Sequence, residues 1–188
     1  MNLLLADWVF GYGSLIWNPE IPFERSEPAR VHGYHRAFCI ASIHYRGTPE
    51  RPGVVLGLDR GGSCTGIAFK LHAADRSAAI ERLYAREMLG AVYRPALVGA
   101  TLHDGRQVRA LTFVANRHSP DYQRLTEAQV MHRLRQCVGT RGPNHEYATN
   151  TWRALRDHGI HDARLGRIAR ALLLRTPGLA REAEPPTP

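Results

Sequence analysis

The sequence predicts an α+β fold in which a compact barrel or strongly curved sheet of short strands is flanked by helices. Three observations support this prediction. Strand-like apolar segments are short and numerous, one pair of them has the pattern of a tight hairpin, and only a few segments have helical apolar periodicity. A doubly wound sheet would instead alternate strands and helices along the whole chain.

Short apolar runs predict the strands. The clearest pair lies in ALVGATLHDGRQVRALTFVA, where Asp104-Gly105 is the signal of a tight turn and apolar residues flank it at roughly alternate positions. Such a pair is antiparallel. Further short strands are expected at residues 8–10, 32–41, 53–58 and 64–70.

Helices are expected at residues 75–90, 126–138, 144–159 and 162–174. In the last of these, apolar residues lie beside arginines, which leaves a membrane-surface helix as an alternative to a helix packed on the core. The length of 188 residues favours one domain, which we assign to residues 1–175. Residues 176–188 are rich in Pro and Ala, and we expect a flexible tail there.

The composition excludes several classes of protein. The net charge is +8 at pH 7, but the arginines are scattered without a basic tract or interleaved aromatic residues, so we expect a solvated surface and no nucleic-acid partner. No apolar run approaches the roughly 20 residues that span a bilayer. The first residues, MNLLLADW, lack the pattern of a signal peptide. We therefore expect a cytoplasmic protein with no membrane partner.

The cysteines and histidines do not form a metal-binding pattern. Cys39, Cys64 and Cys137 are far apart in the sequence and no CxxC occurs, so free thiols are expected rather than disulfides. His32 and His35 lie in a segment that resembles a strand, where their spacing puts them on opposite faces. We therefore expect no metal site.

The helix expected at residues 75–90 carries a carboxylate on its apolar face. Glu87 falls on that face, whereas Glu81 lies off it, near Arg82 and Arg86. One acid is thus expected to face water and arginines, and the other the interior. The apolar face itself is expected to consist of Ile80, Leu83, Tyr84 and Met88.

An inward carboxylate has a raised pKa, because burial disfavours its charged form. Enzymes use such a group as a general base near neutral pH. The alternative is a structural Glu87 that is satisfied by a neighbour such as Arg94 or Tyr93. The helix alone does not decide between these two roles.

The segment WVFGYGSLIW at residues 8–17 is an apolar run that is interrupted by two glycines and a serine. Gly11-Tyr12-Gly13-Ser14 can present consecutive backbone N–H groups, an arrangement that binds carboxylates or oxyanions. The segment lacks the spacing of a dinucleotide loop and the Lys of a phosphate loop, so a nucleotide is not indicated. A bulge or barrel corner is the alternative. Together, the loop and Glu87 describe a site for a small carboxylate-bearing substrate that undergoes proton transfer.

Five segments extend this pattern in order along residues 8–160: FGYGSLIWNP, GYHRAF, HYRGTPERPG, YAREM and GPNHEYATN. This ordered set resembles the ChaC-type glutathione-specific γ-glutamylcyclotransferases. The resemblance implies a small mixed β-barrel with helices on its outside. It also implies cleavage of glutathione to 5-oxoproline and Cys-Gly without a metal or cofactor. Ala148 departs from the family pattern, which has a larger apolar residue after the tyrosine.

The resemblance also implies roles for individual residues. It makes Glu87 the catalytic residue. Arg46 is expected to bind the glycine carboxylate of glutathione or to form a structural salt bridge, and Tyr147 to donate a hydrogen bond to substrate or to cap the pocket. Arg36 is expected to brace the barrel. The γ-glutamyl group would be held by Gly11, Tyr12, Gly13, Ser14, Leu15 and Ile16.

Two alternative functions are compatible with the same site. The substrate could be another γ-glutamyl peptide or amine, or the protein could bind γ-glutamyl compounds or a partner without catalysis. A buried base argues against a binding protein, because binding alone does not need one. No feature of the sequence assigns an oligomeric state.

Overall fold

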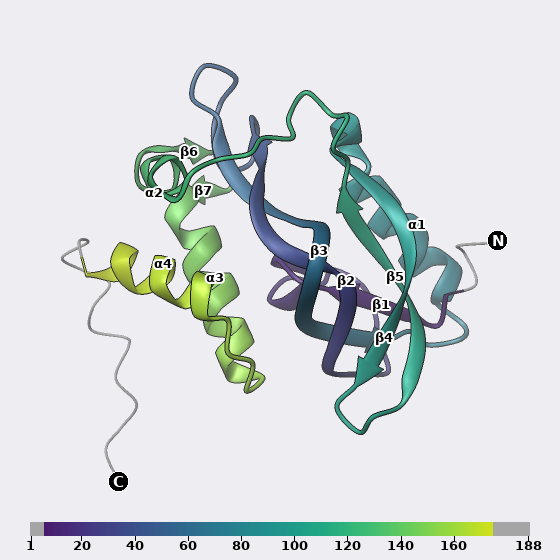
Figure 1. The fold of residues 1–188 in the computed structure, drawn as a ribbon. Helices are drawn as coiled ribbons and strands as arrows, with labels where there is room; N and C mark the ends of the chain where they lie inside the picture. The colour runs from purple at the N-terminus through teal and green to yellow at the C-terminus, as the bar shows by residue number, and fades with distance from the viewer. Residues whose placement is uncertain (1–5, 175–188) are drawn as a thin grey trace, which may run out of the picture.

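The centre of the molecule is a closed β-barrel in the computed structural model, which describes residues 6–174 (Figure 1). The strand order is β1-β3-β2-β4-β5. Most pairs are antiparallel, but β5 pairs in parallel with β1 and β3, so the barrel is mixed. The predicted barrel is therefore confirmed. Its strands are β1 (Trp8–Gly11), β2 (Arg25–Ser42), β3 (Gly53–Lys70), β4 (Tyr93–Leu102) and β5 (Gln107–Ala115).

Two of the strands are much longer than the sequence predicts. β2 and β3 each have 18 residues, and β3 unites the segments expected as separate strands at residues 53–58 and 64–70. The reason is Gly61-Gly62, which has positive φ at both residues (99° and 70°) and lies in a bend of β3 opposite Gly33 (82°). Glycines that look like a break in sequence here let a paired strand bend and continue.

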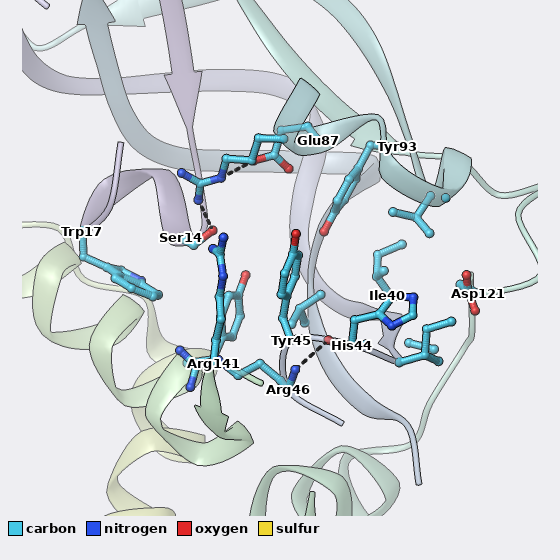
Figure 2. A pocket seen from close by; sticks show the side chains of 18 residues that line it. Ser14, Trp17, Ile40, His44, Tyr45, Arg46, Glu87, Tyr93, Asp121 and Arg141 are labelled. Atoms are coloured by element: carbon cyan, nitrogen blue, oxygen red, sulfur yellow. Dashed lines mark hydrogen bonds and ion pairs between the residues drawn. The ribbon is translucent and has the colours of Figure 1, made fainter. Parts of the chain in front are cut away.

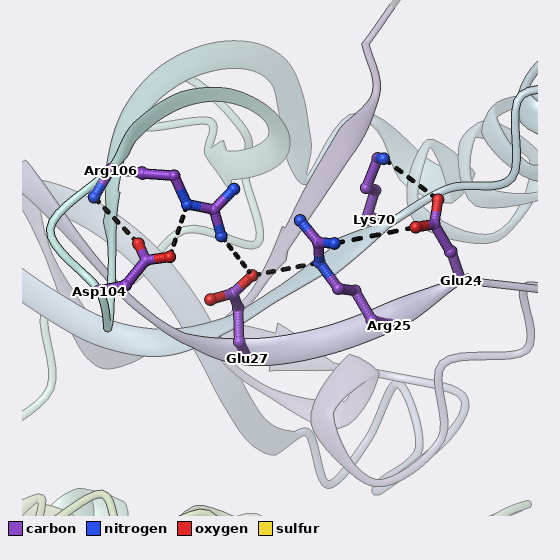
Figure 3. Close-up of polar contacts among 6 residues, drawn as sticks. All are labelled: Glu24, Arg25, Glu27, Lys70, Asp104 and Arg106. Carbon is purple, nitrogen blue, oxygen red and sulfur yellow. Dashed lines mark hydrogen bonds and ion pairs between the residues drawn. The ribbon is translucent and has the colours of Figure 1, made fainter.

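The predicted hairpin joins β4 to β5. Gly105 has a φ of +87°, the left-handed conformation that glycine adopts at little cost, and the Leu102 amide donates to the Arg106 carbonyl at 2.8 Å. Asp104 and Arg106 of this turn begin a chain of surface ion pairs that reaches the start of β2 and the end of β3 (Figure 3). Exposed pairs of this kind contribute little individually. The chain is completed by Glu24, Arg25, Glu27 and Lys70.

The four expected helices are present and lie on two sides of the barrel (Figure 1). α1 covers one side, and α2, α3 and α4 gather on the other. α2 begins with a capping box in which the Thr126 side chain and Gln129 satisfy each other's backbone amides. The helices are α1 (Arg76–Glu87), α2 (Glu127–Gln136), α3 (Asn144–Asp157) and α4 (Ala163–Leu173).

Between α2 and α3 lies a small hairpin that the sequence does not predict. It consists of β6 (Val138–Gly139) and β7 (Gly142–Pro143). Val138 was expected at the end of the helix at residues 126–138, but it lies in β6 and is exposed. The helical spacing of apolar residues continues to Val138, but the helix itself ends at Gln136. The buried residues of α2 are Val130 and Leu134.

The core settles two questions that the sequence raises. In α4, Leu165, Ile168 and Leu172 are buried, so this helix packs on the protein rather than presenting an apolar face outward. All three cysteines are free and buried, as expected. None of the helices within residues 6–174 is long and apolar enough to cross a membrane.

Arg36 holds the barrel, the first loop and the last helix together. Its buried guanidinium donates to the carbonyls of Tyr12 (2.6 Å) and Thr65 (2.8 Å) and to the Asp162 carboxylate (2.6 Å). Asp162 in turn caps α4, because it accepts from the Leu165 amide at 2.9 Å. The predicted bracing role of Arg36 is confirmed.

We expect Arg36→Met to lower the free energy of unfolding by about 3 kcal/mol, because it leaves two carbonyls and a partly buried carboxylate without their cation. Urea denaturation followed by circular dichroism measures this change. Arg30→Met is the control, since the exposed Arg30 side chain on the same strand donates to the Ser63 hydroxyl and forms no ion pair within residues 6–174. This substitution should cost less than about 1 kcal/mol. Equal losses in the two variants would contradict the bracing role.

Candidate active site

A pocket of about 490 Å³ opens between the loop after β1, the end of α1 and the β6–β7 hairpin (Figure 2). Ser14, Glu87 and Arg141 line it, and the Arg141 side chain extends from the hairpin toward Ser14. Aromatic rings form much of the remaining wall. They belong to Trp17, Tyr45, Tyr93 and Tyr147.

The loop after β1 turns sharply and re-enters the core. Ser14–Ile16 form a 3₁₀ turn in which the Ile16 amide donates to the Gly13 carbonyl at 3.0 Å. Leu15 and Ile16 are buried, which explains why apolar residues follow the glycines directly. Within residues 6–174, no acceptor bonds to the amides of Gly13, Ser14 or Leu15. These three residues line a small side cavity of the pocket, and their amides are free to donate hydrogen bonds to a ligand.

The two glycines of the loop make close contacts with their surroundings. A Cβ atom at Gly13 would lie 2.9 Å from the Tyr147 hydroxyl. A Cβ at Gly11 would lie 3.1 Å from both the Leu15 Cβ and the Phe69 ring. The backbone of the loop thus approaches the Tyr147 hydroxyl and the core so closely that a Cβ at either glycine would force a neighbouring group to shift.

Tyr147 reaches the pocket from the first turn of α3. Its hydroxyl accepts a hydrogen bond from the Leu56 amide at 3.3 Å, which leaves its own proton available to another acceptor. Burial raises the pKa of Tyr147, so the hydroxyl stays protonated. The Trp17 ring meets Tyr147 edge-on with centroids 6.4 Å apart. The buried hydroxyl is therefore a fixed donor beside Gly13.

Glu87 is the last residue of α1, and its side chain is only 15% exposed. Burial raises the pKa of its carboxyl, while the positive charge of Arg86 acts in the opposite direction. The predicted inward direction of Glu87 is thus found. Met88, however, was expected on the same face and is 37% exposed, because α1 ends at Glu87 and its periodicity does not continue.

Arg86 is the partner of Glu87, and the sequence did not predict this. Its Nε lies 3.1 Å from the Glu87 carboxylate, and its Nη2 donates to the Ser14 hydroxyl at 3.0 Å. Its Nη1 donates to the Asn18 carbonyl at 2.6 Å and contacts Glu20 at 3.1 Å. Helical spacing placed Arg86 with Glu81 on the outer face, but its long side chain turns toward the loop. The sequence suggests two alternative partners for Glu87, Arg94 and Tyr93. Arg94 is exposed to solvent, and the Tyr93 hydroxyl donates to the Leu56 carbonyl.

The loop, the carboxylate and the tyrosine converge on one small space. A side cavity of about 20 Å³ is bounded by Gly13, Leu15, Glu87 and Tyr147, among others. A space of this size holds about one water molecule. Residues with unpaired amides, a carboxyl of raised pKa and a neutral hydroxyl therefore line a space that fits one small group.

Arg46 lines the pocket, but its guanidinium is engaged elsewhere. Nη1 donates to the Pro143 carbonyl at 2.9 Å and lies 3.3 Å from the Glu146 carboxylate. The residue is only 6% exposed. Of the two roles expected for Arg46, the structure shows the salt bridge, which ties the segment after β2 to the start of α3.

The sequence alone does not place several residues in the pocket wall. Tyr93, Trp17 and Arg141 come from three separate parts of the chain, and only the fold brings them together. No cluster of three or more His, Cys, Asp or Glu side chains within residues 6–174 is placed to hold a metal ion.

Comparison with known proteins identifies similar chains. The family described as ChaC-like protein matches residues 7–173. The glutathione-specific gamma-glutamylcyclotransferase of Escherichia coli K12 is 37% identical over 156 residues, which are 82% of this chain and 68% of that protein. Gamma-glutamylcyclotransferase 2-3 of Arabidopsis thaliana is 32% identical over 177 residues, which are 88% of this chain and 87% of that protein.

A solved structure has the same fold. The crystal structure of a glutathione-specific gamma-glutamyl cyclotransferase from yeast aligns with a TM-score of 0.80, covering 88% of this chain and 94% of that one. Because the sequence identity is 21%, this structural similarity supports an assignment of the fold alone. The γ-glutamylcyclotransferase-like barrel implied by the sequence resemblance is therefore confirmed.

We expect Gly13→Ala to destabilise the protein through its contact with Tyr147, and a double-mutant cycle tests this. Tyr147→Phe removes the hydroxyl that the new Cβ would meet at 2.9 Å. The double variant should therefore lose less free energy of unfolding than the two single variants added together. Strict additivity in urea denaturation would contradict the close approach.

Proposed function

The chain belongs to the family of ChaC-like proteins, and we propose that it is a glutathione-specific γ-glutamylcyclotransferase, which cleaves glutathione to 5-oxoproline and Cys-Gly. The observation that carries this proposal is the convergence of buried Glu87 and the unpaired loop amides on one small space. A raised-pKa carboxylate supplies the base, and amides supply a cradle for carboxylate and oxyanion.

The proposed reaction is intramolecular. The α-amine of the γ-glutamyl group attacks the δ-carbonyl carbon of the same group, and a carbon–nitrogen bond closes a five-membered lactam. The peptide bond to cysteine breaks, so its nitrogen leaves as the amine of Cys-Gly. One proton moves from the attacking amine to the leaving amine, and no water is consumed.

We assign the proton transfer to Glu87. Its carboxylate takes the proton from the attacking amine and then gives it to the leaving nitrogen. A pKa above the ordinary glutamic acid value suits both steps, because the group must accept and release the same proton. Arg86 holds this carboxylate by an ion pair, and its positive charge opposes the rise in the pKa of Glu87 that burial causes.

We assign substrate binding to the loop of Gly11, Tyr12, Gly13, Ser14, Leu15 and Ile16. The amides of Gly13, Ser14 and Leu15 would hold the α-carboxylate and the developing oxyanion. The Tyr147 hydroxyl would donate a further hydrogen bond beside Gly13. Holding the flexible substrate with its amine against its own carbonyl supplies much of the acceleration.

The proposal extends to the organisation and location of the protein. Residues 1–175 would form the single catalytic domain, and the expected tail at residues 176–188 lies outside the described part of the chain. Three free cysteines fit a reducing compartment, so we propose a cytoplasmic enzyme whose partner is glutathione itself.

The direct test is Glu87→Gln, which keeps the shape of the side chain and removes the base. We expect 5-oxoproline release from glutathione to fall by at least about 10²-fold, the usual size of a general base contribution. Chromatography of 5-oxoproline measures the rate. Glu81→Gln is the matched control, because Glu81 is an exposed glutamate of the same helix. Near-normal turnover by a folded Glu87→Gln protein would contradict the assignment.

The pH dependence provides a second test. Activity needs the Glu87 carboxylate, so kcat/KM should fall on the acid side at a pH above the ordinary glutamic acid pKa of about 4.3. Arg86→Gln removes a positive charge that lowers this pKa, so the acid limb should move to higher pH.

Arg82→Gln is the control for this shift, since Arg82 is exposed on the same helix and should leave the limb in place. An acid limb that stays fixed or moves to lower pH in Arg86→Gln would exclude Glu87 as the group that titrates.

A further inference from the structure

The proposed substrate has a second carboxylate, on its glycine, and the pocket contains a cation whose role the proposed chemistry leaves open. Three arginines line the cavity. Arg46 is paired with Glu146, and Arg86 with Glu87 and Glu20. Arg141 forms no ion pair with any carboxylate within residues 6–174. It is therefore the pocket arginine available to an anion from outside.

The backbone of Arg141 is held rigidly. Arg141 lies in the turn between β6 and β7, and its amide donates to the Tyr45 carbonyl at 2.9 Å. The neighbouring Thr140 amide donates to the His44 carbonyl, also at 2.9 Å. A Cβ at Gly139 would lie 2.5 Å from the Gly47 amide nitrogen and from the Tyr45 carbonyl carbon. The hairpin is thus in direct backbone contact with the segment after β2.

The side chain of Arg141 is also directed. Its guanidinium carbon lies 4.2 Å from the centroid of the Tyr45 ring. Stacking on an aromatic face uses the flat side of a guanidinium and leaves the N–H groups at its edge free to bind a carboxylate with two hydrogen bonds. Figure 2 shows Arg141 reaching from the hairpin into the cavity, on the side where Ser14 and Glu87 lie.

The positive charge of Arg141 affects the pKa of carboxyl groups in the site. Among the charges that act on Glu87, that of Arg141 lowers the pKa of the carboxyl, although burial outweighs it. It acts in the same direction on Glu20, whose carboxylate is held by Asn18 and Arg86. Arg141 is thus near enough for its charge to act on Glu87 and Glu20, although it forms an ion pair with neither.

We propose that Arg141 binds the C-terminal glycine carboxylate of glutathione and thereby selects a tripeptide with a free C-terminus. This inference rests on the proposed function. With the γ-glutamyl group held between the loop and Glu87, the Cys-Gly part extends toward the wider cavity, where Arg141 is the free cation. Arg46, expected from the sequence to take this role, has its guanidinium occupied by Pro143 and Glu146.

The test compares two substrates, glutathione and glutathione with its glycine carboxylate converted to the amide. A charge-assisted contact at this position should make wild-type protein prefer glutathione by about tenfold or more in kcat/KM. In Arg141→Gln this preference should fall to less than about twofold, through a higher KM for glutathione with kcat retained. Arg141→Lys keeps the positive charge but lacks the planar guanidinium that can form two hydrogen bonds with a carboxylate. This variant should retain part of the preference for glutathione.

Arg135→Gln is the matched control, because Arg135 is an exposed arginine of α2 outside the pocket, and its removal changes the net charge equally. It should keep the wild-type preference. The proposal is overturned if wild-type protein does not distinguish the two substrates, or if Arg141→Gln keeps the preference. The proposal is also overturned if Arg141→Gln lowers kcat/KM by the same factor for glutathione and for its amide. If wild-type protein released no 5-oxoproline from glutathione or from its amide, the proposed function itself would have failed.

Discussion

The site depends on one guanidinium. Arg86 contacts Glu87, Ser14 and the segment at Asn18 and Glu20, so a single side chain sets the separation between the inward carboxylate and the loop. Lysine could not replace it, because several donors in a fixed plane are needed at once. The position also suits a cation, since Arg86 is in the last turn of α1, where the helix dipole favours positive charge.

Three tyrosines surround the Glu87 carboxylate in the small side cavity. The hydroxyls of Tyr93 and Tyr147 both bond to the backbone of Leu56, and Tyr12 donates to the Phe113 carbonyl. Burial raises the pKa of all three, so they remain neutral donors while Glu87 changes its protonation state. Such surroundings strengthen the interactions of the carboxylate with any amine that enters.

The sequence predicts those features that depend on local pattern. The interruption at Gly11–Ser14 indicates a close approach of backbone, helical spacing turns Glu87 inward, and Asp104-Gly105 indicates the hairpin. It cannot predict features that depend on contacts between distant segments. The continuity of β3 through Gly61-Gly62 depends on pairing with β2, and the direction of Arg86 depends on where the loop lies. Likewise, Arg46 and Arg141 cannot be told apart before Glu146 and Tyr45 are seen beside them.

The central claim is that Glu87 is an inward-facing carboxylate whose pKa is raised by burial, so that it can exchange a proton with the substrate. It is tested most directly by a ¹³C NMR titration of the Glu87 side-chain carboxyl, assigned by its absence from the Glu87→Gln spectrum. The account predicts a titration clearly above the ordinary glutamic acid pKa of about 4.3, with a midpoint that matches the acid limb of kcat/KM. A carboxyl that titrates at or below the ordinary value would contradict it.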